Sequence, residues 1–428
     1  MHEDEIQALA KDYAQRAQRA SRALRAVSTD DKNRTLQLVA DKLRAEPYRT
    51  DILSANEKDI FAATEKSLPN ALVDRLRLSP ERLDGIASGV EVIAHLPDPV
   101  GVISQEKRRP NGLKVSKMKV PLGVIFMIYE SRPNVTIDAA ALCFKASNAV
   151  VLRGGKEALY SNIAFARLFN DALREVKMPS DALVFVETTQ RALMSALLEQ
   201  SAAIDLVIPR GGTGLITAVS EQSKIPVLQH YQGICHVYVH QDANLDKACE
   251  IAFNAKTQRP GVCNAMEGLV VDKQIAGAFL PQMTQKLLEA NVALRLCDES
   301  LKYVPEEIKS KVIKADSDDF HTEFLSLELA IKTVNDSKEA IDFLAEHGSG
   351  HTESIVTENN DVAQIFLRQV DASCVLHNAS TRFNDGGELG LGAELGISTT
   401  KLHAYGPMGL SELCTEKYIV LGDGQIRE

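Results

Sequence analysis

The chain has 428 residues, of which 45% are hydrophobic and 25% charged, and its formal net charge is −10. This length predicts two or three domains, and the acidic balance without a long basic run argues against nucleic acid as the main partner. No apolar stretch is long enough to span a bilayer, and the acidic start at residues 1–5 is unlike a signal peptide. Seven scattered cysteines with no CxxC pair predict free thiols and a cytoplasmic location.

The first hundred residues are predicted to be mostly helical. A hairpin follows them, because Asn111-Gly112 separates strand-like runs over 102–108 and 113–119. Both faces of this hairpin are polar, so we expect it to pair outside its own core, in an oligomer interface. The helical patterns that precede it cover residues 3–26, 32–46, 54–64 and 80–94.

From Val120 onward, short apolar strands alternate with helical patterns. Strands with crossover helices indicate a parallel sheet covered on both faces. The same alternation resumes after Ile225, which predicts a second α/β domain. The strands expected in the first sheet are residues 124–128, 149–152, 183–186 and 204–208, with helices over 136–143, 161–175 and 192–200.

Two glycine-rich turns follow strands of the first sheet. Turns at this edge can present backbone N–H groups and a helix N-terminus to a phosphate. The first turn adds two cations, which suits a second phosphate such as the 2′-phosphate of NADP. Neither turn matches a standard nucleotide-binding fingerprint, and ordinary tight turns are the alternative; two such turns with basic flanks favour a dinucleotide site. The residues are Arg153, Gly154, Gly155 and Lys156 in the first turn, and Gly211, Gly212 and Thr213 in the second.

Cys263 is the candidate nucleophile. It follows Pro260-Gly261, where a bend would expose the sulfur, and Arg259 is a nearby cation that would favour the thiolate. A small buried cysteine is the alternative. Asn134, just past a buried strand, could donate its amide N–H to an oxyanion, and Arg132 could hold an anion; an ordinary proline turn is the alternative there.

Two histidine-containing segments have residue types that suit other roles. His230, Cys235, His236 and His240 have the residue types of a metal site, but strand alternation places Cys235 and His236 on opposite faces, so we expect no metal. The polar loop 347–353 could supply a general acid, an anion ligand or only a loop, and the residues alone leave these open.

Seven segments together resemble the gamma-glutamyl phosphate reductase family of the aldehyde dehydrogenase superfamily, over nearly the whole chain. The resemblance implies an aldehyde-dehydrogenase-like α/β fold with a Rossmann-like NADP-binding domain (1–103 and 120–230) and an α/β catalytic domain (231–410). A small β element (104–119 and 411–428) would serve oligomerisation. The segments are 120–124, 128–136, 151–156, 255–267, 346–355, 378–383 and 401–404.

The resemblance implies NADPH-dependent reduction of L-glutamyl 5-phosphate to L-glutamate 5-semialdehyde, the second step of proline synthesis from glutamate. Cys263 would carry a thioacyl intermediate, and Asn134 with the Cys263 N–H would stabilise the oxyanion. Glu323 matches the place where the superfamily holds the nicotinamide ribose, while Arg132 and Arg259 are our candidates for binding the acyl phosphate.

Two other functions are alternatives to this reduction. Hydrolytic aldehyde dehydrogenases carry a carboxylate base about 30 residues before the nucleophile, where this chain has Gln229-His230-Tyr231-Gln232-Gly233. Without that base a thioacyl enzyme survives, which favours an acyl-phosphate reductase over an enzyme that oxidises a small aldehyde. A protein that only binds a nucleotide would not need a reactive thiol.

Three positions depart from the family pattern: Tyr405 stands where Arg is usual, Gly268 where Thr is common and Ser147 where Gly is common. Tyr405 bears on how the anionic end of the substrate is held. No kinase-like segment lies in the chain, so we expect a separate glutamate 5-kinase as a partner, and a homo-oligomer.

Overall fold

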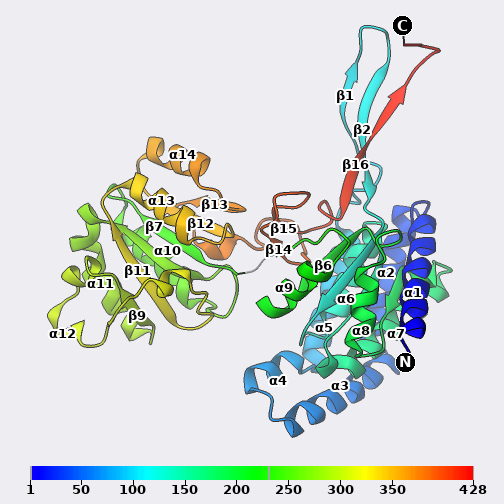
Figure 1. Ribbon diagram of the computed structural model, residues 1–428, viewed down its shortest axis with the longest axis horizontal. Helices are drawn as coiled ribbons and strands as arrows, with labels where there is room; N and C mark the ends of the chain where they lie inside the picture. Colours follow the sequence, from blue (N-terminus) through cyan, green and yellow to red (C-terminus); the bar gives the residue numbers. More distant parts are fainter. Residues whose placement is uncertain (1, 230–231, 428) are drawn as a thin grey trace. The chain divides into compact units, whose positions relative to one another are not determined.

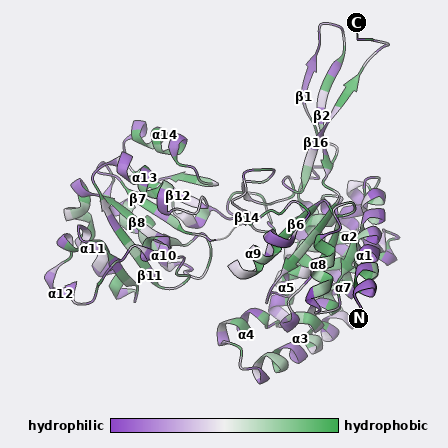
Figure 2. Ribbon diagram, in the orientation of Figure 1, coloured by the Kyte–Doolittle hydropathy of each residue, from purple (hydrophilic) through white to green (hydrophobic). Residues whose placement is uncertain are grey.

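The computed structural model describes residues 2–229 and 232–427. The chain divides into two compact units. The first comprises residues 1–229, 391–396 and 408–428, and the second comprises residues 230–390 and 397–407. Each unit has strands of apolar residues at its centre and hydrophilic residues on its outer helices and loops (Figure 2). No helix among the described residues is both long and apolar enough to cross a bilayer.

The first unit is built on a parallel sheet with strand order β5-β4-β3-β6. Its strands are β3 (Val124–Tyr129), β4 (Ala149–Arg153), β5 (Leu183–Phe185) and β6 (Leu206–Arg210). Helices pack around this sheet (Figure 1). They are α1 (Glu3–Leu24), α2 (Thr29–Arg44), α3 (Tyr48–Glu65), α4 (Asn70–Leu76), α5 (Pro80–His95), α6 (Val135–Lys145), α7 (Leu159–Glu175), α8 (Arg191–Leu198) and α9 (Thr213–Gln222).

A separate antiparallel sheet, β1-β2-β16, extends away from the helices of the first unit (Figure 1). It consists of β1 (Ile103–Arg108), β2 (Lys114–Pro121) and β16 (Cys414–Leu421). Gly112 adopts φ +91° in the hairpin turn, a conformation that favours glycine. The predicted hairpin therefore forms, and the C-terminal strand pairs with it along its full length, from Cys414 opposite Pro121 to Leu421 opposite Lys114.

The second unit contains a parallel sheet with strand order β10-β9-β11-β8-β7-β12-β13. The strands are β7 (Cys235–Val239), β8 (Met266–Asp272), β9 (Ala293–Leu296), β10 (Ile313–Lys314), β11 (Glu328–Val334), β12 (Thr352–Val356) and β13 (Cys374–His377). The helices are α10 (Leu245–Thr257), α11 (Lys273–Glu289), α12 (Glu306–Lys309), α13 (Ser337–His347) and α14 (Asn360–Gln369). A short antiparallel pair, β14 (Ile397–Ser398) and β15 (Gly406–Pro407), completes the unit, with 3-10 turns at 300–303, 318–321 and 381–383.

Several helices begin where a side chain can satisfy the free N–H groups of the first turn. Ser28 accepts from Asp31 at the start of α2, and Ser79 accepts from Arg82 at the start of α5. Asp336 accepts from Lys338 and Glu339 at the start of α13. Capping of this kind stabilises a helix by about 1 kcal/mol, and it fixes where each of these helices starts.

Two elements extend beyond their predicted bounds for identifiable reasons. Helix α3 begins at Tyr48, whereas the prediction began at Ser54. Ile52 is buried in the first turns of the helix, but the next buried positions on its face are the polar Asn56 and Asp59, so no apolar repeat leads back to Tyr48. Asn56 donates to the Leu76 carbonyl and Asp59 accepts from Ser161. Strand β6 continues through Pro209 and Arg210 past the predicted end at Ile208. It lies at the edge of its sheet, where a proline is tolerated.

Candidate active site

Cys263 lies in the loop that connects α10 to β8, at the centre of the second unit's sheet. Cys263 is half-buried, whereas Cys143, Cys235 and Cys414 are buried. Burial raises the pKa of all three of these thiols, to about 11 for Cys414. Cys263 thus lies in a partly exposed setting, which the reactive form of a thiol requires.

Gly233 links Cys263 to Glu323. A Cβ atom at Gly233 would lie 2.1 Å from the Cys263 carbonyl oxygen, so only glycine fits there. The Gly233 N–H donates to Glu323, while burial raises the pKa of this carboxyl group. The carbonyl oxygen of Cys263 also accepts from the Cys235 thiol at 3.1 Å. The structure therefore brings two predicted site residues, Cys263 and Glu323, against one backbone segment.

The two ends of the Cys263 loop are joined by a buried ion pair that the sequence reasoning missed. Lys256, near the end of α10, lies 2.5 Å from Glu267, near the start of β8, and both side chains are inaccessible. Burial raises the pKa of Glu267 to about 7, an effect that Lys256 opposes. Glu267 also accepts from the Leu325 backbone N–H at 3.2 Å, two residues after Glu323. The pair therefore fastens the nucleophile loop to the Glu323 segment.

Two arginines lie beside the nucleophile loop. Arg259, predicted to bind the acyl phosphate, is exposed. Arg382 is half-buried, and its Nε donates to Gln258 at 2.9 Å. Burial lowers the pKa of Arg382; Asp385 and the Cys263 thiolate raise it, and Arg259 lowers it. Arg382 therefore lies close to both Cys263 and Arg259, and no site role was predicted for it.

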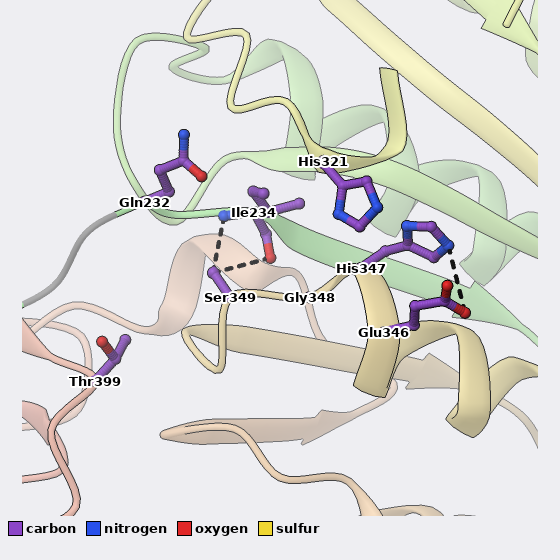
Figure 3. Close-up of a pocket in the computed structure, with 8 residues that line it drawn as sticks. All are labelled: Gln232, Ile234, His321, Glu346, His347, Gly348, Ser349 and Thr399. Carbon is purple, nitrogen blue, oxygen red and sulfur yellow. Dashed lines mark hydrogen bonds and ion pairs between the residues drawn. The ribbon is translucent and has the colours of Figure 1, made fainter. Parts of the chain in front are cut away.

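A cavity of about 260 Å³ opens in the second unit beside the segment that contains Gly233 (Figure 3). The rings of His321 and His347 lie against each other in its lining, with centroids 4.2 Å apart and ring planes tilted by 46°. Ser349 accepts from the Ile234 N–H at 2.9 Å and so fixes the His347 loop beside Cys235. Burial and the neighbouring His321 lower the pKa of His347, which favours its neutral form. The cavity is lined by Gln232, Ile234, His321, Glu346, His347, Gly348, Ser349 and Thr399.

The residues weighed for a metal have other partners. His236 pairs with the buried Glu353 through Nδ1, at 3.1 Å from each carboxylate oxygen, while Cys235 contacts the Cys263 carbonyl. His240 contacts Thr357. His230 lies outside the described residues, as does Tyr231 of the segment that lacks a catalytic base. Among the described residues, no cluster of three or more His, Cys, Asp or Glu side chains could hold a metal ion.

The predicted cofactor residues of the two glycine-rich turns lie in the first unit, at the carboxyl ends of β4 and β6, whereas Glu323 lies in the second unit. Gly154 and Gly155 are packed so tightly that a Cβ atom would lie 2.0 Å from Asn162 and 2.1 Å from Glu157, respectively. The Nε of Arg153 is buried and has no hydrogen-bond partner, and Lys156 is exposed. A buried guanidinium N–H without a partner fits an anionic ligand, so this turn suits a phosphorylated nucleotide.

The second glycine-rich turn holds a carboxylate of the protein itself. The Gly212 N–H, at the start of α9, donates to Glu130 at 3.0 Å. A Cβ atom at Gly211 would lie 2.4 Å from the same carboxylate. Glu130 thus occupies an N–H group at this helix N-terminus, and the role of the turn in binding a phosphate stays a prediction.

Asn134 lies directly before α6, with Arg132 two residues earlier and exposed. The Asn134 amide donates to Asp138 at 2.8 Å, which fixes the orientation of the side chain. Burial raises the pKa of Asp138 to about 6. Asn134 and Arg132 belong to the first unit, and Cys263, Arg259 and Glu323 belong to the second.

The three departures from the family pattern have clear local settings. Tyr405 donates its hydroxyl to Asp371 at 3.3 Å. A Cβ atom at Gly268 would lie 2.3 Å from the His236 ring, so no larger residue fits there without a shift. Ser147 adopts φ +58°, which glycine accommodates at lower cost.

Comparison with known proteins reveals close similarity over the full length. The model of the aldehyde dehydrogenase family matches residues 4–302. The gamma-glutamyl phosphate reductase of Idiomarina loihiensis is 52% identical over 99% of this chain and 100% of its own, and that of Aquifex aeolicus is 48% identical over 96% and 95%. The crystal structure of the Thermotoga maritima enzyme of the same name matches with a TM-score of 0.94 at 42% identity, covering 98% of this chain and 100% of that one. These matches confirm the predicted fold class.

Proposed function

The chain belongs to the aldehyde dehydrogenase family and, within it, to the gamma-glutamyl phosphate reductase family, and from this premise we propose that it reduces L-glutamyl 5-phosphate to L-glutamate 5-semialdehyde with NADPH. The observation that carries the proposal is the placement of Cys263. This thiol is half-exposed in a loop that a buried ion pair and Gly233 hold in place, and relatives of this name are similar over the whole chain.

In this proposal the Cys263 thiolate attacks the acyl carbon and the phosphate leaves, so that a thioester forms. Asn134 and the Cys263 N–H donate to the oxyanion, and Arg259 and Arg132 attract the phosphate. NADPH, when bound, supplies the hydride that converts the thioester to the aldehyde. Glu323 would hold the ribose of the nicotinamide half, beside the Gly233 segment that also contacts Cys263.

The preference for NADP is attributed to the first glycine-rich turn. Arg153 offers a buried N–H without a partner, and Lys156 is an exposed cation beside it. Together they would bind the 2′-phosphate, for which a guanidinium and an ammonium group supply charge-assisted hydrogen bonds. The tightly packed Gly154 and Gly155 let the backbone approach the nucleotide, and the second turn, Gly211 to Thr213, would receive the diphosphate once Glu130 moves aside.

We further propose that the sheet β1-β2-β16 makes a homo-oligomer contact in the cytoplasm. Its strands expose Ile103, Tyr418, Val420 and Leu421, each by more than half. A labile acyl phosphate would also favour a complex with the glutamate 5-kinase that supplies it. Light scattering of the purified chain, alone and mixed with the kinase, measures both associations: a monomer contradicts the first, and no mass gain contradicts the second.

The reverse reaction tests the proposed activity. With L-glutamate 5-semialdehyde and NADP, we expect NADPH to form over many turnovers only when phosphate is added, and Cys263→Ala to abolish this turnover while Cys249→Ala retains it. Cys249 is a matched control because it is a half-buried thiol on α10. NADPH formation beyond one equivalent per chain without phosphate would indicate a hydrolytic dehydrogenase instead, and activity in Cys263→Ala would contradict the assigned nucleophile.

A further inference from the structure

Arg382 is fixed to the nucleophile loop on both sides of Cys263. Its Nε donates to Gln258, five residues before the cysteine, at 2.9 Å. Two residues after Arg382, the Asn384 carbonyl accepts from the Asn264 amide at 2.9 Å, and Asn264 directly follows Cys263. The 3-10 turn that carries Arg382, Thr381–Phe383, therefore lies along the loop that presents the thiol.

The guanidinium of Arg382 still has donors available. In the described parts of the chain, no residue accepts a hydrogen bond from its two terminal nitrogens, and no carboxylate lies within ion-pair distance. Burial lowers the pKa of Arg382, and repulsion by the nearby Arg259 lowers it further, although Asp385, Cys263 and Glu388 raise it. An anion bound between the two arginines would relieve this repulsion. Arginine suits the task because its planar fork donates two parallel hydrogen bonds to a phosphate.

We propose that Arg382 binds the phosphoryl group of the acyl-phosphate substrate, with Arg259 beside it, and faces the Cys263 thiolate. This inference rests on the proposed function. In the step it serves, the sulfur–carbon bond forms and the bond from the acyl carbon to the phosphoryl oxygen breaks. The electron pair leaves with inorganic phosphate, which takes its proton from solvent, because a guanidinium remains charged. Arg382 would stabilise the negative charge that accumulates on the leaving oxygen.

Protection of Cys263 by inorganic phosphate tests this role without any turnover. Iodoacetamide, which is uncharged, alkylates the thiolate, and peptide mass spectrometry locates the product at Cys263. In the wild type we expect phosphate to slow this alkylation in a saturable manner. In Arg382→Gln we expect the protecting phosphate concentration to rise about tenfold or more, since a charge-assisted hydrogen-bonded contact contributes on the order of 1.5–3 kcal/mol. We also expect the pH dependence of alkylation to shift to higher pH.

Two further variants make the result decisive. Arg382→Lys retains the positive charge but not the two parallel hydrogen-bond donors of the guanidinium. It should therefore preserve most of the pH dependence of alkylation and bind phosphate more weakly than the wild type. Arg368→Gln, which removes an exposed arginine of α14, should behave as the wild type. Phosphate protection that is unchanged in both Arg382 variants overturns the inference, whatever happens to the alkylation profile. Loss of the reverse reaction with phosphate protection intact would instead count against the proposed function.

Discussion

The orientation of the Asn134 side chain depends on Asp138, whose carboxyl group changes its protonation with pH. Asp138 accepts the Asn134 amide N–H at 2.8 Å, and burial raises the pKa of its carboxyl group to about 6. A folded-state pKa above the ordinary carboxyl value means that the folded protein favours the protonated form. The resulting stabilisation is present below about pH 4 and is lost as the pH rises through 6.

We therefore predict that Asp138→Asn becomes more stable relative to the wild type as the pH rises from 4 to 7. The difference should reach on the order of 1 kcal/mol, after allowance for the partial exposure of this residue. Urea unfolding at several pH values measures it, with the exposed Asp41→Asn as the control. A constant difference between Asp138→Asn and the wild type across this range would show that Asp138 does not titrate as described.

At the residue scale, the sequence could indicate Cys263 but not the residues that support it. The Pro-Gly bend before the cysteine is a local pattern. The need for glycine at 233 arises only because its backbone lies against the Cys263 carbonyl. Arg382 reaches Gln258 across 124 positions of sequence, so no spacing rule could place it beside the nucleophile. The roles of Asn134, Arg132 and Arg259 in catalysis stay predictions.

At the scale of elements, the turn between β4 and α7 is the proposed determinant of cofactor choice. We predict that Lys156→Glu weakens NADPH binding by about ten- to a hundredfold, because a carboxylate repels the 2′-phosphate that the ammonium group would attract. NADH binding should change little. A fluorescence titration of each nucleotide measures this, and Lys11→Glu, an exposed lysine on α1, is the control. Equal losses for NADPH and NADH would contradict the assignment.

The elements themselves followed from the sequence wherever one physical rule dominated. Buried strands alternating with helices predicted that the first sheet is parallel and that a second α/β domain follows, and Asn111-Gly112 predicted the hairpin. The start of α3 was missed because Ile52, which is buried in its first turns, is followed on the same face by Asn56 and Asp59, polar residues with partners elsewhere in the first unit. Hydrophobic periodicity cannot detect a helix face whose contacts are hydrogen bonds.

At the scale of the whole molecule, the fold class and the family relationship are confirmed. Local sequence patterns could not predict how the chain passes from one unit to the other and back. Residues 391–396 and 408–428 belong to the first unit although they follow most of the second. The strand 414–421 is recognisable in the sequence, but its partner β2 lies about 300 residues earlier. Pairing at that distance depends on the tertiary fold.

The central claim is that Cys263 carries the acyl group, and trapping that intermediate tests it most directly. The enzyme is mixed with L-glutamate 5-semialdehyde and NADP without phosphate, quenched in acid, digested and analysed by mass spectrometry. We predict that the Cys263 peptide gains the mass of one glutamyl group, that one NADPH forms per active chain, and that added phosphate removes the adduct. Continued NADPH formation with Cys263 unmodified would contradict the account.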